Sequence, residues 1–233
     1  MTKKHVRKRI PSLKGFTPSR ALKNMKSASL KVLQGIKSKK FAREVPKFFR
    51  KNYSACWKFF SESRRHMIFA LGIFALFFII GFALPIFFRE EILDFIAKMV
   101  VTLEGKSIIG LIGFIFFNNL KASFIAIVTG IGIGIFPLVI GIINGYILGF
   151  VVRGAITEKG LFVVWQLFPH GIFELPAVIL SIGIGLKIGS DLFKKDDKLK
   201  YNFKEGLRFF AFVIFPLLLI AGIIEGILVG LMG

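Results

Sequence analysis

Long apolar runs alternate with short charged segments along most of this chain. An α-helix rises about 1.5 Å per residue, so about 20 apolar residues cross the hydrocarbon core of a bilayer. The pattern therefore predicts an all-α membrane protein with a transmembrane domain over residues 67–233. Its five predicted helices cover residues 67–88, 107–135, 137–152, 161–186 and 209–232.

The predicted helix over 107–135 is interrupted by two polar residues, Asn118 and Asn119. Neither apolar half is long enough to span alone, so we expect a helix broken or kinked near these asparagines, or a re-entrant half-helix. Non-helical backbone at that depth must be buried in protein or line a wet cavity. The glycine-rich stretch 130–134 then predicts a tight turn into the third helix; the alternative is one long helix bent at Pro137.

Basic residues are concentrated at the start of the chain. The formal net charge is +20, and residues 1–66 hold 20 of the 33 Lys and Arg residues but only two acids, Glu44 and Glu62. Residues 1–40 are also rich in Ser and poor in large apolar side chains. This composition predicts a basic, mostly disordered arm.

Residues 41–66 combine aromatic and basic side chains in a helical pattern. Phe41, Val45, Phe49 and Tyr53 recur at four-residue steps, with Lys and Arg between them. This pattern predicts an amphipathic helix lying on an anionic membrane surface. Anionic lipid is the expected partner, in preference to nucleic acid; a plain positive-inside anchor without a specific partner is the simplest alternative.

Charge also predicts the orientation of the chain in the membrane. Segment 89–106 has three basic and four acidic residues, whereas segment 187–208 has seven basic and four acidic ones. Basic segments remain on the cytoplasmic side. We therefore expect a multi-pass protein of the cell membrane with a cytoplasmic N-terminus and a non-cytoplasmic C-terminus.

A small set of polar residues falls inside the predicted spans. His170 and Glu174 are four residues apart, so a helix presents them on one face. Ionisable residues at membrane depth are costly and indicate a functional site. The candidate intramembrane cluster is Asn118, Asn119, Asn144, His170, Glu174 and Glu225.

Several glycines are candidates for helix packing. Asn144 and Glu225 occupy equivalent places in a faint repeat, each followed by Gly at the first and fifth positions after it. Small residues at four-residue spacing let helix backbones approach closely in lipid. Such faces pack within one chain or form a homo-oligomer. The predicted packing glycines are Gly145, Gly149, Gly171, Gly226 and Gly230.

These residues also resemble a known family. The relevant motifs are Asn118-Asn119, Asn144-Gly145, Pro169-His170-Gly171 with Glu174 and Ala177, and Ile224-Glu225. Together they resemble the stage II sporulation protein M family of membrane proteins, over about residues 67–233. In spore formers the resemblance implies a membrane scaffold for a peptidoglycan-degrading complex.

Three functions are compatible with the cluster. The first is a membrane scaffold, in which the polar residues organise helices and the protein recruits membrane partners. The second is a transporter or channel that uses Glu174, Glu225 and His170 for protons or ions. The third, a metal-dependent hydrolase, is the weakest, because the other histidines, His5 and His66, precede the first span. We therefore expect no catalytic residues, cofactor or metal.

The interfacial prediction can be tested on a peptide of residues 1–66. We expect it to float with vesicles that contain anionic lipid and to be released at 1 M salt, where the Debye length falls to about 3 Å. Binding that does not change with salt would contradict an electrostatic anchor. Vesicles of neutral lipid are the control.

Overall fold

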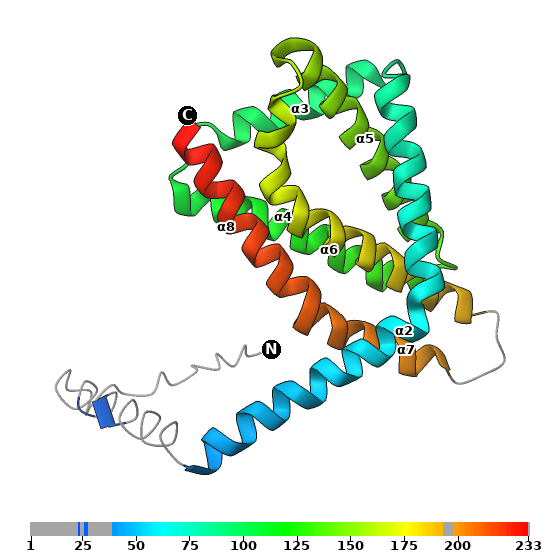
Figure 1. Cartoon of the computed structure of the whole chain (residues 1–233), viewed down its shortest axis with the longest axis vertical. Helices are drawn as coiled ribbons and strands as arrows, with labels where there is room; N and C mark the ends of the chain where they lie inside the picture. The colour runs from blue at the N-terminus through cyan, green and yellow to red at the C-terminus, as the bar shows by residue number, and fades with distance from the viewer. Residues whose placement is uncertain (1–22, 24–25, 28–38, 193–197, 233) are drawn as a thin grey trace, which may run out of the picture. The chain divides into compact units, whose positions relative to one another are not determined.

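The computed structural model describes residues 23, 26–27, 39–192 and 198–232 of the 233 (Figure 1). The predicted arm, residues 1–40, lies almost wholly outside this part. The chain divides into two compact units, residues 1–51 and 52–233. In the first unit the described structure is mainly the beginning of the first long helix.

Helices account for every regular element in the part of the chain that the structure describes. Five segments are long and apolar enough to cross a membrane: Arg43–Ala83, Ile108–Ile131, Ile135–Lys159, Gly171–Asp191 and Lys198–Leu231. The predicted class, an all-α multi-pass membrane protein, is confirmed.

The elements are α2 (Lys39–Ala83), α3 (Arg89–Leu103), α4 (Ile108–Val128), η1 (Thr129–Ile131), α5 (Ile135–Lys159), α6 (Val163–Asp191), α7 (Lys198–Phe209), the π-helical η2 (Phe210–Ile214) and α8 (Phe215–Met232).

The predicted break near Asn118 and Asn119 is wrong. Both residues lie inside α4, which is one continuous helix from Ile108 to Val128. The Asn119 side chain forms a hydrogen bond with Glu174 of α6. Because a neighbouring helix satisfies this amide, it does not compete with the backbone hydrogen bonds of α4.

The chain turns instead at the glycine-rich stretch, as the tight-turn prediction required. The 3₁₀ turn η1 follows α4, and Gly134 has a left-handed conformation (φ 74°) immediately before α5. A Cβ on Gly130 would lie only 2.4 Å from the Gly185 carbonyl oxygen of α6. Pro137 falls in the first turn of α5, where its missing N–H costs nothing. The single bent helix is therefore excluded.

Other helices are longer than predicted. α2 includes the predicted interfacial segment and most of the first span in one helix, and α5 continues to Lys159. The basic segment 187–208, between the last two predicted spans, is largely helical, because α6 continues to Asp191 and α7 begins at Lys198. α7 buries one side, including Asn202 and Phe209.

The largest buried cluster joins α2, α4, α6, α7, η2 and α8. Phe59 of α2 lies against Phe209, with ring centroids 6.3 Å apart, and both are fully or almost fully buried. The predicted interfacial segment thus contacts other helices from Tyr53 onward. The other core residues include Ile127, Ile184, Ile188, Ile214 and Leu218.

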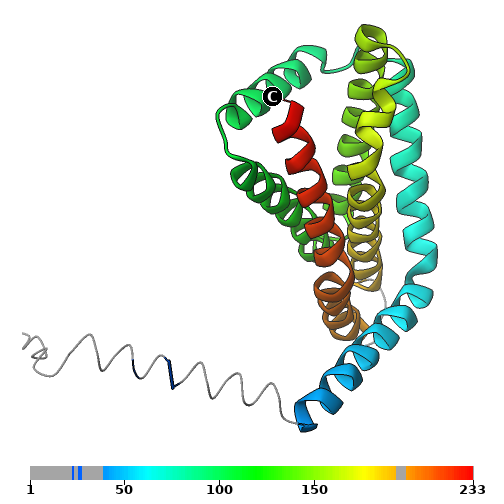
Figure 2. The ribbon, with the colours of Figure 1, turned by 60° about the vertical axis from the view of Figure 1, so that its left-hand side comes forward.

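Glycines bring two helix pairs into backbone contact. Figure 2 shows α5 running beside α2. On α5, a Cβ at Gly149 would lie 2.1 Å from the Phe78 carbonyl oxygen of α2. On α8, a Cβ at Gly226 would lie 2.7 Å from the Ile112 backbone nitrogen of α4. Any residue with a Cβ at either glycine position would force the two helices apart.

The remaining predicted packing glycines differ among themselves. A Cβ at Gly145 would lie 2.5 Å from the Phe74 carbonyl oxygen of α2. A Cβ at Gly230 would lie 2.6 Å from the Ile108 side chain of α4. A Cβ at Gly171 would meet only the Leu175 side chain of its own helix, at 3.7 Å. Four of the five glycines therefore lie at close helix contacts, and Gly171 does not.

Replacement of Gly149 by Ala tests the α2–α5 contact. Because the added Cβ overlaps backbone, we expect the free energy of unfolding to fall by about 1–3 kcal/mol, measured by thermal and chemical unfolding in detergent. Gly154→Ala, also in α5, is the matched control, since a Cβ at Gly154 would have no neighbouring atom within 4 Å. Equal effects of the two substitutions would contradict the backbone-contact interpretation.

Candidate functional site

Two carboxylates from different transmembrane helices line one cavity. Glu174 lies in α6 and Glu225 in α8, and the two interact electrostatically. The cavity has a volume of about 600 Å³. Its other lining residues are Phe78, Leu148, Val151, Val152, Val164, Gly171, Ile172, Leu175, Pro176 and Ile179.

The surroundings of the two carboxylates differ. The Asn119 amide of α4 donates a hydrogen bond to Glu174. The Oε2 atom of Glu225 is buried and has no hydrogen-bond partner among the described residues. A buried polar atom without a partner is costly, so the Glu225 carboxyl is the part of this site that a proton, a cation or a further donor would stabilise.

The glycine contacts hold this site in place. Gly226 directly follows Glu225 and packs against Ile112 of α4, and Gly222 one turn earlier packs against Phe116. The α4–α8 contact therefore sets the depth of Glu225 relative to Asn119. Three helices, α4, α6 and α8, meet at the carboxylates.

Not all predicted cluster residues join this site. Asn118 is exposed. Asn144 is also exposed, and its Nδ2 donates to the Ile140 carbonyl oxygen of its own helix at 2.8 Å. His170 lies in α6, one turn before Glu174, but its side chain falls outside the described part of the structure. The described cluster is thus Asn119, Glu174 and Glu225.

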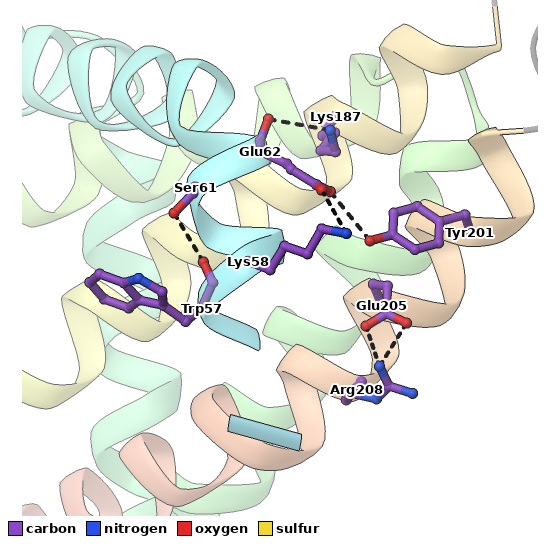
Figure 3. A network of polar contacts seen from close by, with 8 residues as sticks. All are labelled: Trp57, Lys58, Ser61, Glu62, Lys187, Tyr201, Glu205 and Arg208. Carbon is purple, nitrogen blue, oxygen red and sulfur yellow. Dashed lines mark hydrogen bonds and ion pairs between the residues drawn. The ribbon is translucent and has the colours of Figure 1, made fainter. Parts of the chain in front are cut away.

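A second polar network, which sequence reasoning missed, links α2 to α6 and α7 (Figure 3). Lys187 Nζ donates to the Glu62 carbonyl oxygen at 3.4 Å, and the Tyr201 hydroxyl donates to Glu62 Oε2 at 3.4 Å. Ser190 Oγ lies 3.0 Å from His66 Nε2. These contacts join α2 to residues 187–208, the basic segment between the last two predicted spans.

Buried polar side chains of α7 complete this network. Asn202, 2% exposed, donates from Nδ2 to Asp191 Oδ2 of α6. Arg208 Nη1 donates to both carboxylate oxygens of Glu205, at 2.7 and 2.5 Å. The signal that was available is the helical spacing of Asn202, Glu205 and Phe209, which places them on one side of α7.

The chemistry available at the intramembrane site is that of carboxylates and an amide. Among the side chains that the structure describes, which do not include His170, no three His, Cys, Asp or Glu residues gather in the manner of a metal site. Glu174 and Glu225 can accept hydrogen bonds, protons or a cation.

Comparison with known proteins identifies the family. A family model described as stage II sporulation protein M matches residues 66–229. The chain belongs to the stage II sporulation protein M family. The match confirms the resemblance seen in the motifs, and it includes every residue of the predicted cluster. The preceding basic residues lie outside it.

A relative from an archaeon is also similar to this stage II sporulation protein M family member. An uncharacterized protein of Methanocaldococcus jannaschii is 34% identical over 102 residues, which cover 40% of this chain and 46% of the relative. The chain thus matches less than half of that relative's length. No solved structure matches the chain.

Replacement of Asn119 tests the link between α4 and α6. We expect Asn119→Leu to lower the free energy of unfolding by about 0.6 kcal/mol, and by at most about 1.7 kcal/mol, the range measured for hydrogen bonds between membrane helices. Asn118→Leu is the matched control, because the neighbouring residue is exposed and should change stability little. Equal losses in thermal unfolding would show that the Asn119–Glu174 bond contributes nothing specific.

Proposed function

We propose that this protein is an integral membrane scaffold, in which Asn119, Glu174 and Glu225 fix the arrangement of three helices. The observation that carries the proposal is that these polar side chains come from α4, α6 and α8 and meet beside the glycine contact of α4 with α8. A scaffold requires helices held in one relative position, and polar contacts in lipid specify geometry more than they add stability.

Recruitment of membrane partners is the second part of this proposal. The stage II sporulation protein M family match supports it, since the resemblance implies assembly of other proteins at a membrane. On this hypothesis the lipid-facing helices present the docking surfaces, and the junction at Glu174 and Glu225 keeps them in place. Self-association through such faces is part of the same hypothesis.

A proton- or cation-linked role is a second candidate. It is favoured by the cavity of about 600 Å³ that both carboxylates line, and by the buried Oε2 of Glu225 without a described partner. Intramembrane carboxylates beside a cavity are common in ion pathways. The two candidates predict different effects of neutralising the same side chain.

Flux measurements on proteoliposomes separate the candidates. For a scaffold we expect no proton or cation flux above that of empty liposomes, and we expect Glu225→Gln to leave thermal stability unchanged or higher, because a buried charge is removed. For the transport candidate, the protein would carry a flux that Glu174→Gln and Glu225→Gln abolish. Glu158→Gln, at an exposed carboxylate of α5, is the control and should change neither measurement.

A flux with this sensitivity would overturn the scaffold as a full account of the protein. His170→Ala adds a further arm to the experiment. If it lowers only thermal stability and the yield of oligomer, His170 supports the helix junction rather than chemistry.

A further inference from the structure

A second cavity lies at the end of α2, where the chain turns into α3. Its volume is about 590 Å³, and pockets of about 300–1,000 Å³ hold small molecules. Isoleucines from α2, α3 and α5 form about half of its wall. The cavity shares no lining residue with the one at the candidate functional site. Its other lining residues are four aromatic side chains and one carboxylate: Phe77, Phe87, Phe88, Tyr146 and Glu91.

This cavity begins at the membrane boundary and extends into the bilayer. The apolar span of α2 ends at Ala83, and the charged residues Arg89, Glu90 and Glu91 begin α3. α3 runs across the end of α2 (Figure 1). Phe77 precedes the end of the span by six residues, so it lies about 9 Å deeper along the helix axis. A ligand with its polar group at Glu91 would therefore extend its apolar part toward Phe77.

The Glu91 carboxylate is available to a ligand. It lies in the first turn of α3, where the helix dipole favours negative charge. Its side chain is exposed and makes no hydrogen bond or ion pair with another described residue. In contrast, Asp94 of the same helix pairs with Lys98, and the two atoms are 2.6 Å apart. Since α3 has three acidic and two basic residues, it favours a cation over an anion.

Aromatic rings beside a carboxylate are typical of ammonium recognition. A cation above an aromatic ring is attracted by the negative face of the ring, and cages of such rings bind quaternary ammonium groups. The Tyr146 hydroxyl is already engaged by the backbone of Leu84 and Phe87. Among the described residues, Glu91 is the one charged side chain in the wall. The wall therefore fits an apolar molecule that carries a single, weakly hydrated cation.

The conformation of Phe88 supports this interpretation. Its backbone is left-handed (φ 54°), which is an outlier for a bulky residue, and its exposed fraction is 71%. Residues in such strained conformations are concentrated at ligand clamps and other functional sites. Glycine would adopt this conformation without strain. A ring at this position adds little to the core, so we interpret it as a contact for a bound molecule.

We propose that this cavity binds an amphiphile with an ammonium group and an apolar tail. The ammonium group lies between Phe87, Phe88 and Glu91, and the tail packs against Phe77 and the isoleucines of α5. Free alkylammonium ions and lipids with a choline headgroup share this chemistry. The site does not include the residues of the proposed scaffold junction, so the two proposals are tested separately.

Photo-crosslinking of the full chain in a nonionic detergent tests the proposal. The probe is an alkyltrimethylammonium ion that carries a diazirine in its chain, and mass spectrometry maps the labelled residues. We expect labels within residues 77–92 and 142–147. Hexyltrimethylammonium should suppress this labelling at a concentration about fivefold lower than its uncharged analogue, in which carbon replaces the nitrogen, because only the cation is attracted by the rings and the carboxylate.

Competing lipids then identify the source of the ammonium group. Lysophosphatidylcholine and lysophosphatidylglycerol are compared at equal concentration in the same detergent. Suppression of labelling by the choline lipid alone would show that the site accepts a lipid headgroup. Suppression by free alkylammonium ions alone would show that it accepts a soluble amphiphile, and either result supports the ammonium site.

Substitutions assign the preference to this cavity. Glu91→Gln should reduce the advantage of the charged competitor about fivefold. Glu90→Gln is the matched control, because it removes the same charge from the same turn but outside the cavity wall. Phe88→Gly should weaken labelling without lowering thermal stability, since it relieves the left-handed backbone. Ile143→Trp, at a half-exposed position of α5, should reduce labelling by filling the cavity.

The proposal fails on any of three results. The first is equal competition by hexyltrimethylammonium and its uncharged analogue. The second is an equal effect of Glu91→Gln and Glu90→Gln, because that would indicate general attraction of cations to α3. The third is labelling spread over other helices, with no concentration within residues 77–92 and 142–147.

Discussion

Backbone-to-backbone contact at glycines is the constraint on which the transmembrane arrangement depends. Helices in lipid gain little from the hydrophobic effect when they associate, so close packing and a few polar contacts must hold them together. Gly149 of α5 and Gly226 of α8 let their helices approach the α2 and α4 backbones to a separation that leaves no room for a Cβ. Gly130 and Gly185 do the same where the turn after α4 crosses α6.

The polar side chains then depend on this packing. Glu225 immediately precedes a contact glycine, so the position of α8 on α4 decides which groups its carboxyl meets. Asn119 reaches Glu174 from the same helix that receives Gly226. A shift of α8 along α4 by one turn would move Glu225 away from this pair. The packing of α8 on α4 therefore determines the geometry of the candidate site.

The two ends of these helices differ in how they satisfy polar groups. At one end, the Tyr146 hydroxyl of α5 accepts from the Phe87 N–H and lies 3.0 Å from the Leu84 and Phe87 carbonyl oxygens, where α2 has ended. At the other, side chains of α2, α6 and α7 form the network around Glu62 and Asp191. Lys58 of α2 and Lys187 of α6 both contact Glu62 in that network.

The sequence alone determined the membrane class, the five spans, the family and the turn at residues 130–134. Run length and glycine content carry these features directly, because the thickness of the bilayer and the left-handed conformation at Gly134 act locally. Only the tertiary structure decided that α4 passes through Asn118 and Asn119 unbroken, since local propensity is a weak guide that helix packing overrides. It also decided that Asn144 is exposed and outside the site, whereas Asn119 and Glu225 both interact with Glu174. A helical sequence shows which residues share a face, but the packing of other helices decides what that face meets.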